Sequence, residues 1–394
     1  MAPKIYSFLT SLIVILLAPM LATSLAGAQT FSVVFTFTDS SQGAVPQGPL
    51  LIDAAGDLYG TAYLGGASNY GTVYKVDPSG TLTVLHSFPF GTLDGSEPVG
   101  GLVLDKRGTH VYGVTYHGGN PGTLCTVDRC GTIFWVTPTG EEQIVHRFGK
   151  NDGLFGIRPQ FGLTADPDGA FYGTATFGGT NGTGVVFRLS NGTYTVLHSF
   201  GPEYGTGDGA FPQGPLLRDS AGNLYGTTGF GGQFGSGTVF KIDTAGNETV
   251  LYSFTGGADG LQPEFNLVRD SAGNLYGTTH YSQDIRGGTI FKLHKSGKLT
   301  VLYTFANADS AGLVRDAAGN IYGSSSQGTF GTLFKLDTSR KMTALHTFTG
   351  GADGGYPGVL MMDAAGNIYG PTGQGGDLNC AAAGGCGVIF KLKP

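Results

Sequence analysis

The pattern of hydrophobic and polar residues repeats along most of the chain, in short apolar runs that Gly-rich segments separate. Residues 212–254 contain four such runs, LLRD, NLYGTT, GTVFKID and TVLYSF. Each run has the length and the β-branched or aromatic content of a strand, and the gaps contain the Gly, Asp and Asn of tight turns. This segment therefore predicts four short strands.

Three sequence markers show that nearly the same segment occurs seven times. A Tyr-Gly pair begins at Tyr59, Tyr112, Tyr172, Tyr225, Tyr276, Tyr322 and Tyr369. A strand that opens with Gly follows each pair, at residues 71–75, 131–135, 184–188, 237–241, 288–292, 331–335 and 387–391. An aromatic-ended strand follows only six of them, at residues 84–88, 144–148, 196–200, 250–254, 301–305 and 344–348. The missing copy stands before the first repeat, as the orphan strand VVFTF at residues 33–37.

This phase shift indicates a closed ring whose two ends share one blade. Seven repeats of about four strands match an all-β fold, the seven-bladed β-propeller, in which residues 33–37 close the last blade. A β-helix would have a much shorter period, and an open array would not need the shift.

The turns indicate where the two rims of the ring lie. Asp-x-x-Gly turns connect the first two strands, as at residues 53–56, 219–222, 270–273, 316–319 and 363–366, and turns of similar length connect the last two. The opposite rim carries loops that differ between repeats, at residues 63–70, 116–130, 177–183, 230–236, 281–287 and 373–386. A rigid scaffold with variable loops on one rim is typical of recognition, so functional residues are expected there.

Residues 312–323, GLVRDAAGNIYG, carry the most complete copy of the motif, which continues as Gly-Thr-aliphatic-Phe-Lys and Val-Leu-His-Ser-Phe in other repeats. This combination resembles the GloVer-type (choice-of-anchor) tandem repeat of exported bacterial proteins, over nearly all of the chain. The resemblance implies an extracytoplasmic bacterial propeller, in a family without an agreed activity or catalytic residues that could be transferred. The C-terminal sequence has no recognisable anchor, which puts attachment to the cell surface in doubt.

The N-terminus has the layout of a secretory signal peptide. Lys4 precedes an apolar stretch at residues 8–25, and Ala26-Gly27-Ala28 forms a small-x-small cleavage signal. We therefore expect a signal peptide at residues 1–28 and a single propeller domain at residues 29–394, secreted or periplasmic and monomeric. An uncleaved membrane anchor is the alternative reading. No second long apolar run follows, so no transmembrane segment is expected in the mature chain.

The charge of the chain bounds its partners. The net charge of −6, without a cluster of Lys or Arg, argues against a nucleic-acid partner.

The four cysteines fit an oxidising compartment and form two close pairs at the same place in two repeats. We expect two local disulfides, Cys125–Cys130 and Cys380–Cys386, rather than a zinc site, because a four-Cys site would need loops of distant repeats to meet.

The candidate ligand-binding residues are aromatic and His side chains just past the second strands, on the variable rim. They are Tyr63, Tyr116, His117, Phe177, Phe230, His280 and Tyr281. Aromatic rings around a shallow funnel suit stacking on sugars or apolar ligands, although covering the top of the core explains them equally well. His117 and His280, with Asp284 and Arg286 nearby in sequence, are the one place where a general acid or base is conceivable.

Three other repeated features favour structural roles. His86, His146, His198 and His346 share a position that carries Tyr or Phe in other repeats, which indicates packing of a flat ring. Asp-Gly-x-x-Pro recurs at residues 94–98, 208–212, 259–263 and 353–357, but one carboxylate per loop is weak support for structural calcium, and no cofactor or metal is expected. Arg218, Arg269 and Arg315 share an inner-strand position, where ion pairs with nearby Asp are favoured over an anion site.

The sequence contains no nucleophile elbow, metal triad or phosphate loop. The function that follows is a secreted binding or scaffold module for an unknown extracellular ligand, such as a polysaccharide or a cell-surface partner. The alternative is a carbohydrate-active enzyme, a polysaccharide lyase or hydrolase, with its site on the variable rim.

Overall fold

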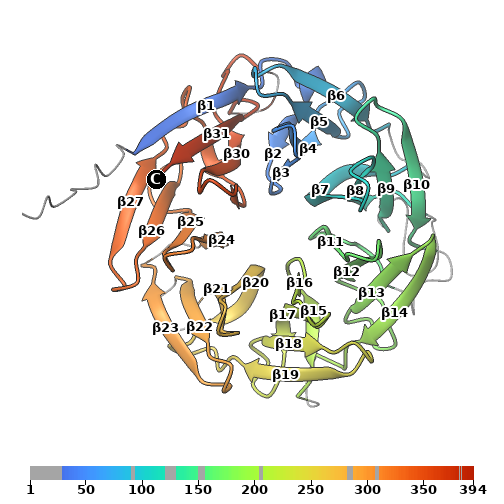
Figure 1. Cartoon of the computed structure of the whole chain (residues 1–394), viewed down its shortest axis with the longest axis vertical. Coiled ribbons are helices and arrows are strands. Elements are labelled where there is room, and N and C mark those ends of the chain that lie inside the picture. Colours follow the sequence, from blue (N-terminus) through green and yellow to red (C-terminus); the bar gives the residue numbers. More distant parts are fainter. Residues whose placement is uncertain are drawn as a thin grey trace, which may run out of the picture.

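The computed structural model describes residues 29–89, 94–119, 130–149, 156–203, 207–281, 287–306, 310–380, 382 and 384–394. Its strands form seven antiparallel sheets in a ring, each with its first strands beside a central channel and its last strand at the periphery (Figure 1). The predicted seven-bladed β-propeller is confirmed. The expected signal peptide, residues 1–28, lies outside the described residues. In the described part of the chain, no helix has the length and apolar character needed to span a membrane.

The blades follow one another around the ring in chain order (Figure 1). Blade one contains β2 (Ala44–Pro46), β3 (Leu51–Ile52), β4 (Leu58–Leu64), β5 (Thr72–Val76) and β6 (Leu82–Ser87). Blade two contains β7 (Ser96–Leu104), β8 (Val111–His117), β9 (Thr132–Val136) and β10 (Glu142–Arg147). Blade three contains β11 (Leu163–Ala165), β12 (Phe171–Ala175), β13 (Val185–Ser190) and β14 (Thr193–Ser199). Blade four contains β15 (Gly209–Pro212), β16 (Leu217–Arg218), β17 (Leu224–Gly231), β18 (Thr238–Ile242) and β19 (Glu248–Ser253).

The remaining blades have the same plan. Blade five contains β20 (Leu261–Arg269), β21 (Leu275–Tyr281), β22 (Thr289–Leu293) and β23 (Leu299–Thr304). Blade six contains β24 (Ser310–Arg315), β25 (Ile321–Ser325), β26 (Thr332–Leu336) and β27 (Met342–Thr347). Blade seven contains β28 (Gly355–Pro357), β29 (Met361–Met362), β30 (Ile368–Gln374), β31 (Val388–Lys393) and the N-terminal β1 (Thr30–Thr36). A short 3₁₀ helix, η1 (Ser40–Gln42), follows β1.

The N-terminal strand closes the ring, as the phase shift of the repeats predicts. β1 pairs antiparallel with β31, so that Thr30 lies opposite Lys393 and Thr36 lies opposite Val388. The strand starts three residues before the expected position 33, and Phe37 continues the contact because its N–H donates to Gly387 O at 3.2 Å.

The Tyr-Gly marker has a physical explanation in the short turns. In blade four, Asp219 Oδ1 accepts hydrogen bonds from the N–H groups of Ala221 and Asn223, and Oδ2 accepts one from the Tyr225 hydroxyl at 3.0 Å. Burial opposes ionisation of Asp219, but the hydrogen bonds from Asn223 and Tyr225 outweigh it and lower the pKa of this carboxyl group. Gly226 follows because a Cβ there would lie 2.5 Å from Phe240 Cζ.

The hydrophobic core consists of seven clusters, one between each pair of neighbouring blades. Each cluster contains the Phe that ends or follows an outer strand, and all seven of these rings are buried. They are Phe37, Phe88, Phe148, Phe200, Phe254, Phe305 and Phe348. The aromatic-ended strands of the sequence therefore supply the packing between one blade and the next.

Every outer pair of strands has a bulge just before its last aromatic or His position. In blade one, Val84 lies opposite Tyr74 and His86 lies opposite Val73, so Leu85 is an extra residue in the outer strand. Equivalent register shifts occur in the other six blades. Because a bulge reverses the alternation of side chains, it turns His86 to the face of the sheet that carries Val73.

Candidate functional site

Six blades share, on or just before their first strand, a backbone conformation that is unfavourable for most residues. The residue before a proline has a φ between 52° and 58° at Val45, Glu97, Arg158, Phe211, Gln262 and Tyr356, and we call these six residues the pre-proline ring. Left-handed φ is uncommon outside Gly and is an outlier for the β-branched Val45. The side chain is different in every blade, although the backbone is the same.

Hydrogen bonds between blades hold this conformation. The N–H of Glu97 donates to Tyr70 O at 2.7 Å, and the N–H of Phe211 donates to Thr183 O at 2.7 Å. The N–H groups of Arg158, Gln262 and Tyr356 donate in the same way to Cys130 O, Ser236 O and Phe330 O. Each acceptor belongs to the preceding blade, so the assembly of the ring imposes the strain. The backbone is therefore fixed while the side chain is free to differ.

Side chains of blades two, three and four join into a continuous row on the variable rim. The guanidinium carbon of Arg158 lies 5.6 Å from the ring centroid of Tyr116 and 5.0 Å from that of Phe177. Phe211 then contacts Phe177 at 5.4 Å and Phe230 at 5.8 Å between ring centroids. We call these five residues the aromatic arc. All five are half-buried, so part of each side chain remains accessible.

The two candidate acid–base histidines are each held by a carboxylate. His117 Nδ1 lies 3.0 Å from Glu97 Oε2, and His280 Nδ1 lies 3.3 Å from Glu264 Oε2. His280 also stacks on Tyr281, with ring centroids 4.0 Å apart. His117 is on β8 and His280 is on β21, three blades away, and the two do not share a cavity in the described structure. Asp284 and Arg286 lie outside the described residues.

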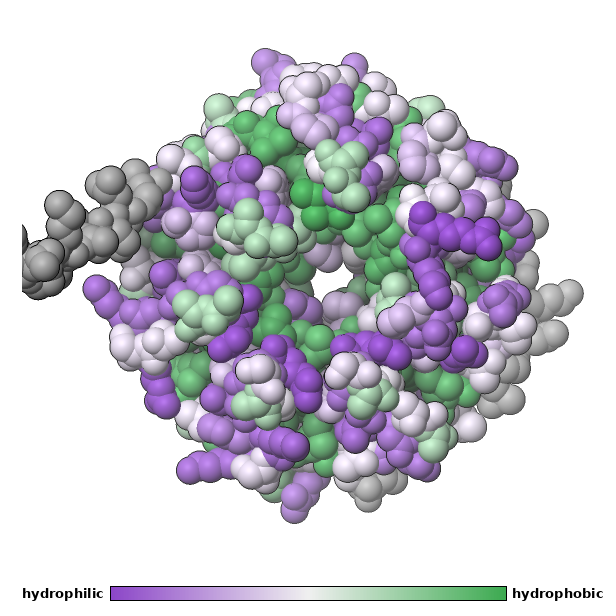
Figure 2. All heavy atoms as spheres, viewed as in Figure 1, coloured by the Kyte–Doolittle hydropathy of each residue, from purple (hydrophilic) through white to green (hydrophobic). Residues whose placement is uncertain are grey.

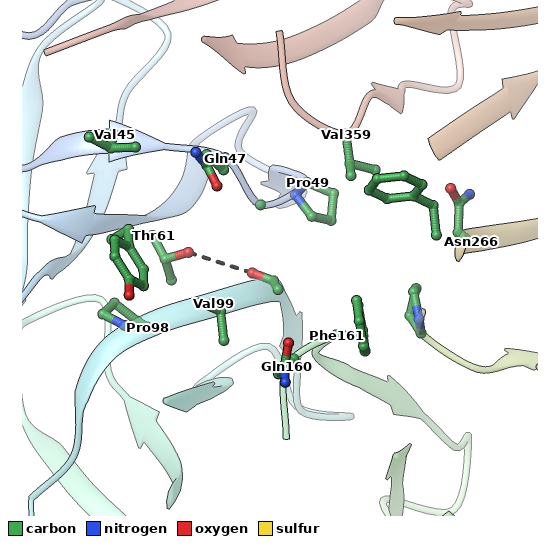
Figure 3. A pocket seen from close by; sticks show the side chains of 15 residues that line it. Val45, Gln47, Pro49, Thr61, Pro98, Val99, Gln160, Phe161, Asn266 and Val359 are labelled. Carbon is green, nitrogen blue, oxygen red and sulfur yellow. Dashed lines mark hydrogen bonds between the residues drawn. The ribbon is translucent and has the colours of Figure 1, made fainter. Parts of the chain in front are cut away.

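The central channel narrows to an apolar cavity of about 210 Å³. Residues in or beside the first strands of several blades line it, including Pro49, Val99, Phe161 and Val359 (Figure 3), and Tyr63 is also among the lining residues. Thr61 Oγ1 donates to Gly100 O across two blades at 3.5 Å. The space-filling view likewise shows hydrophobic residues gathered around the central opening and hydrophilic residues toward the periphery (Figure 2). A ligand that entered the channel would meet mainly apolar surface.

A second cavity, of about 320 Å³, is lined mainly by residues of blades five, six and seven, whereas the aromatic arc belongs to blades two, three and four. His280, Phe265, Ser325 and Tyr356 are among its lining residues. It brings one pre-proline ring residue together with one predicted site residue, but it contains only one side chain suited to acid–base chemistry.

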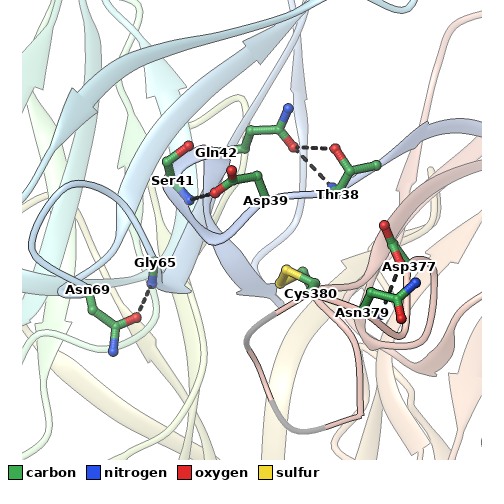
Figure 4. Close-up of a disulfide and its surroundings, with 10 residues drawn as sticks. Thr38, Asp39, Ser41, Gln42, Gly65, Asn69, Asp377, Asn379 and Cys380 are labelled. Atoms are coloured by element: carbon green, nitrogen blue, oxygen red, sulfur yellow. Dashed lines mark hydrogen bonds between the residues drawn. A yellow bond between two sulfur atoms is a disulfide. The ribbon is translucent and has the colours of Figure 1, made fainter.

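One predicted disulfide is confirmed. Cys380 and Cys386 are bonded, and both are buried in the cluster that also contains Phe37 (Figure 4). Cys130 is buried and disulfide-bonded, while its expected partner Cys125 lies outside the described residues.

The structure thus unites some of the sequence-predicted site residues and separates others. Tyr116, Phe177 and Phe230 belong to the arc, and His117 is next to it. Tyr63, His280 and Tyr281 lie elsewhere on the rim. The sequence missed the pre-proline ring, because a residue before proline normally adopts an extended conformation and gives no sign of an exposed left-handed position. The sign of this ring in the sequence is a Pro that recurs in the repeats while the residue before it varies.

The sequence favoured ion pairs with nearby Asp for the three repeated arginines; among the described residues Arg218 makes such a pair, whereas Arg269 and Arg315 lie over Tyr rings. Arg218 Nε lies 3.1 Å from Asp166 Oδ2, in the turn of the preceding blade. Arg269 lies over the Tyr225 ring at 5.9 Å, and Arg315 lies over the Tyr276 ring at 5.4 Å. Each arginine therefore ties one blade to the next.

The fold is similar to that of several solved structures. A streptogramin B lyase is 14% identical over 93% of this chain and 97% of its own, with a TM-score of 0.60. A catalytically inactive virginiamycin B lyase from Staphylococcus aureus is 15% identical over 93% of this chain and 99% of its own, with a TM-score of 0.61. The extracellular domain of a putative hybrid two-component system from B. thetaiotaomicron is 15% identical over 93% of this chain and 41% of its own, with a TM-score of 0.58.

At these identities the likeness extends to the fold alone. No curated protein sequence matches the chain. The Gloeobacter/Verrucomicrobia repeat, in contrast, matches residues 23–205 and 126–312, which together span most of the sequence. The chain belongs to the Gloeobacter/Verrucomicrobia repeat family.

Proposed function

We propose that this protein is an exported binding module that holds a polysaccharide on the aromatic arc. The observation that carries this proposal is the pre-proline ring, in which one strained backbone position is repeated in six blades with a different side chain in each. A position that is constant in backbone and variable in side chain is suited to recognition, since the scaffold is preserved whatever the side chain contacts.

The chemistry of the arc favours a sugar ligand. Rings that are half-buried can stack on the apolar face of a sugar at low entropic cost. Arg158 lies between Tyr116 and Phe177, where a guanidinium could pair with the carboxylate of a uronic acid. The row of contacts from Tyr116 to Phe230 favours an extended ligand over a compact one.

Export is part of the same proposal. The leader-like residues 1–28 and the disulfide between Cys380 and Cys386 support an oxidising compartment outside the cytoplasm. The extracellular propeller domain from B. thetaiotaomicron, similar in fold, is consistent with it.

The test measures binding of the mature chain to a panel of neutral and uronic-acid polysaccharides. Phe177→Ala and Phe211→Ala should each weaken binding by about 30-fold, which corresponds to about 2 kcal/mol for a central aromatic contact. Tyr356→Ala is the control matched to Phe211→Ala, since Tyr356 has the same strained backbone as Phe211 and an exposed ring but lies outside the arc. Equal losses for all three variants, or none for the arc variants, would contradict the proposal.

The same polysaccharides should also be incubated with the protein and analysed for products. Binding without product is expected. Product formation that disappears in His117→Ala or in His280→Ala would show instead that the protein is a lyase or a hydrolase.

A further inference from the structure

At several blade junctions within the described residues, three side chains come together at the periphery of the ring. One stands two residues before the buried Phe of an outer strand, the second is an Asp of the following loop, and the third lies near the start of the next blade's outer strand. At two junctions they are metal-ligating residues throughout. They are His86, Asp94 and Glu142 between blades one and two, and His198, Asp208 and Glu248 between blades three and four.

The bulge of the outer hairpin brings the His to the junction. His86 lies opposite Val73, which belongs to the same core cluster as Val136 of blade two. Glu142 lies opposite Val136 on the neighbouring sheet. The second site is built in the same way, because His198 lies opposite Val186, Glu248 lies opposite Ile242, and Val186 and Ile242 share one core cluster. The three ligands therefore come from two blades and the loop that joins them.

The polar atoms of each trio converge. One ligand atom from each of the three residues lies within 4.8 Å of the other two at both sites. His86 Nε2 is 4.0 Å from Asp94 Oδ2, and His198 Nε2 is 3.4 Å from Asp208 Oδ2. Apart from these contacts between His and Asp, the Nε2 atom of each His and the Oε1 atom of each Glu are buried without a hydrogen-bond partner. These orphaned atoms point to a missing partner, since buried polar atoms are normally satisfied.

The surroundings hold the ligands in place. The N–H groups of Gly201 and Gly209 donate to the two oxygens of Asp208, at 2.6 Å and 2.7 Å. The imidazole rings of His86 and His198 each pack edge-on against the buried Phe two residues later, with centroids 4.6 Å and 4.8 Å apart. Such support orients a ligand before an ion binds.

The other five junctions show that Glu is not needed for packing. Its position is taken by Tyr194, Leu299, Met342, Phe31 and Leu82. Where a His is retained, an aromatic ring covers it, since Tyr194 stacks on His146 at 4.3 Å and Phe31 stacks on His346 at 3.7 Å. At the remaining three junctions another ring replaces the His. The residue at the Glu position is then Leu or Met, and it packs in the same hydrophobic cluster as that ring. At these seven positions Glu occurs only beside a His and an Asp.

The charges at the two sites are unbalanced. Each combines two carboxylates in a partly buried crevice, and Arg147, which acts on Glu142, is exposed. Each crevice therefore brings two acidic side chains and one imidazole together.

We propose that His86–Asp94–Glu142 and His198–Asp208–Glu248 each bind one divalent transition-metal ion, with Zn²⁺ as the best match. One imidazole nitrogen and two carboxylate oxygens form a ligand set that Zn²⁺ accepts, with a fourth position left for water. Ca²⁺ and Mg²⁺ prefer oxygen ligands alone, so the imidazole selects against them. The ion neutralises the two carboxylates and ties neighbouring blades together, as a clamp at two of the seven junctions.

The test uses the tag-free mature chain, dialysed against a chelator without reductant and titrated with Zn²⁺ by calorimetry. Bound metal is counted by elemental mass spectrometry. Wild type should bind two Zn²⁺ ions per chain, Glu142→Gln and Glu248→Gln one each, and the double variant none. Zn²⁺ should raise the melting temperature of wild type and leave that of the double variant unchanged.

His346→Gln is the matched control, because the junction of blades six and seven pairs His346 with Asp353 at 3.0 Å but has Phe31 in place of the Glu. This variant should still bind two ions. Without metal, the double variant should be at least as stable as wild type, since it removes repulsion between carboxylates. The proposal is wrong if wild type binds less than one Zn²⁺, or if the double variant retains both ions. It is also wrong if the metal-free double variant melts at a lower temperature, because a protonated His then bridges the two carboxylates.

Discussion

Phe37 offers the most direct test of how the ring is closed. Its side chain is fully buried between blades seven and one, with its ring 5.2 Å from that of Tyr74. Phe200 occupies the same position between blades three and four, also fully buried and 5.2 Å from the ring of Phe240. The two residues differ in that Phe37 belongs to a strand that is joined to its blade by pairing with β31 and not by a hairpin.

Phe37→Ala should therefore cost as much stability as Phe200→Ala. Truncating a fully buried Phe removes its transfer free energy and leaves a cavity, which together amount to about 3–5 kcal/mol. Because the environments of the two rings match, we expect the two losses to agree within about 1 kcal/mol. An N-terminal strand that were only loosely attached would give a much smaller loss for Phe37→Ala.

Urea unfolding followed by far-ultraviolet circular dichroism measures both free energies. Val33→Ala is the control on the same strand, since Val33 is 38% exposed and its truncation should cost less than about 1 kcal/mol. If Phe37→Ala unfolds like wild type while Phe200→Ala loses about 3–5 kcal/mol, the N-terminal strand does not close the ring.

Two further predictions concern the turns and the acid stability of the fold. Asp219→Ala removes the acceptor for Tyr225 and for two backbone N–H groups, so urea unfolding at pH 7 should show a loss of about 2–3 kcal/mol. The lowered pKa of Asp219 means that its contribution is present above its usual pKa of 3.8 and is lost as the pH falls below it, so the difference from wild type should shrink in acid. For His146, burial lowers the pKa from 6.5 to about 4, so the unfolded chain binds more protons between these values. Wild type should therefore lose up to about 3 kcal/mol between pH 7 and pH 4.5, and His146→Phe should lose less; identical pH profiles would contradict this assignment.

The sequence determined the fold to a large extent because each blade is a local unit. The Tyr-Gly pair, the Asp-x-x-Gly turn and the buried Phe recur with nearly constant spacing, and each serves a contact within a blade or with its neighbour. Even the ring closure was visible, since residues 33–37 repeat a strand that the last blade lacks. Local disulfide pairing followed for the same reason, because Cys380 and Cys386 close one loop of one blade.

The binding surface was only partly predictable. Tyr116 and Phe230 lie at the end of a recognisable strand and Phe177 lies just after one, and all three were found by position alone. Arg158 and Phe211 were not, because only the hydrogen bonds between blades force a residue before proline into the left-handed conformation. Which aromatic residues form one row depends on the order of blades around the ring and on contacts between them.

The sequence by itself determined the repeats, their number and the closure of the ring, because short-range patterns encode strands and turns. Read as a sequence, His86 and His198 are packing residues, since other copies carry Tyr or Phe there. Only the tertiary structure placed Glu142 beside His86 and Glu248 beside His198. The physical reason is the bulge in each outer strand, which turns the imidazole toward a neighbouring blade whose residues are about 50 positions away in the chain.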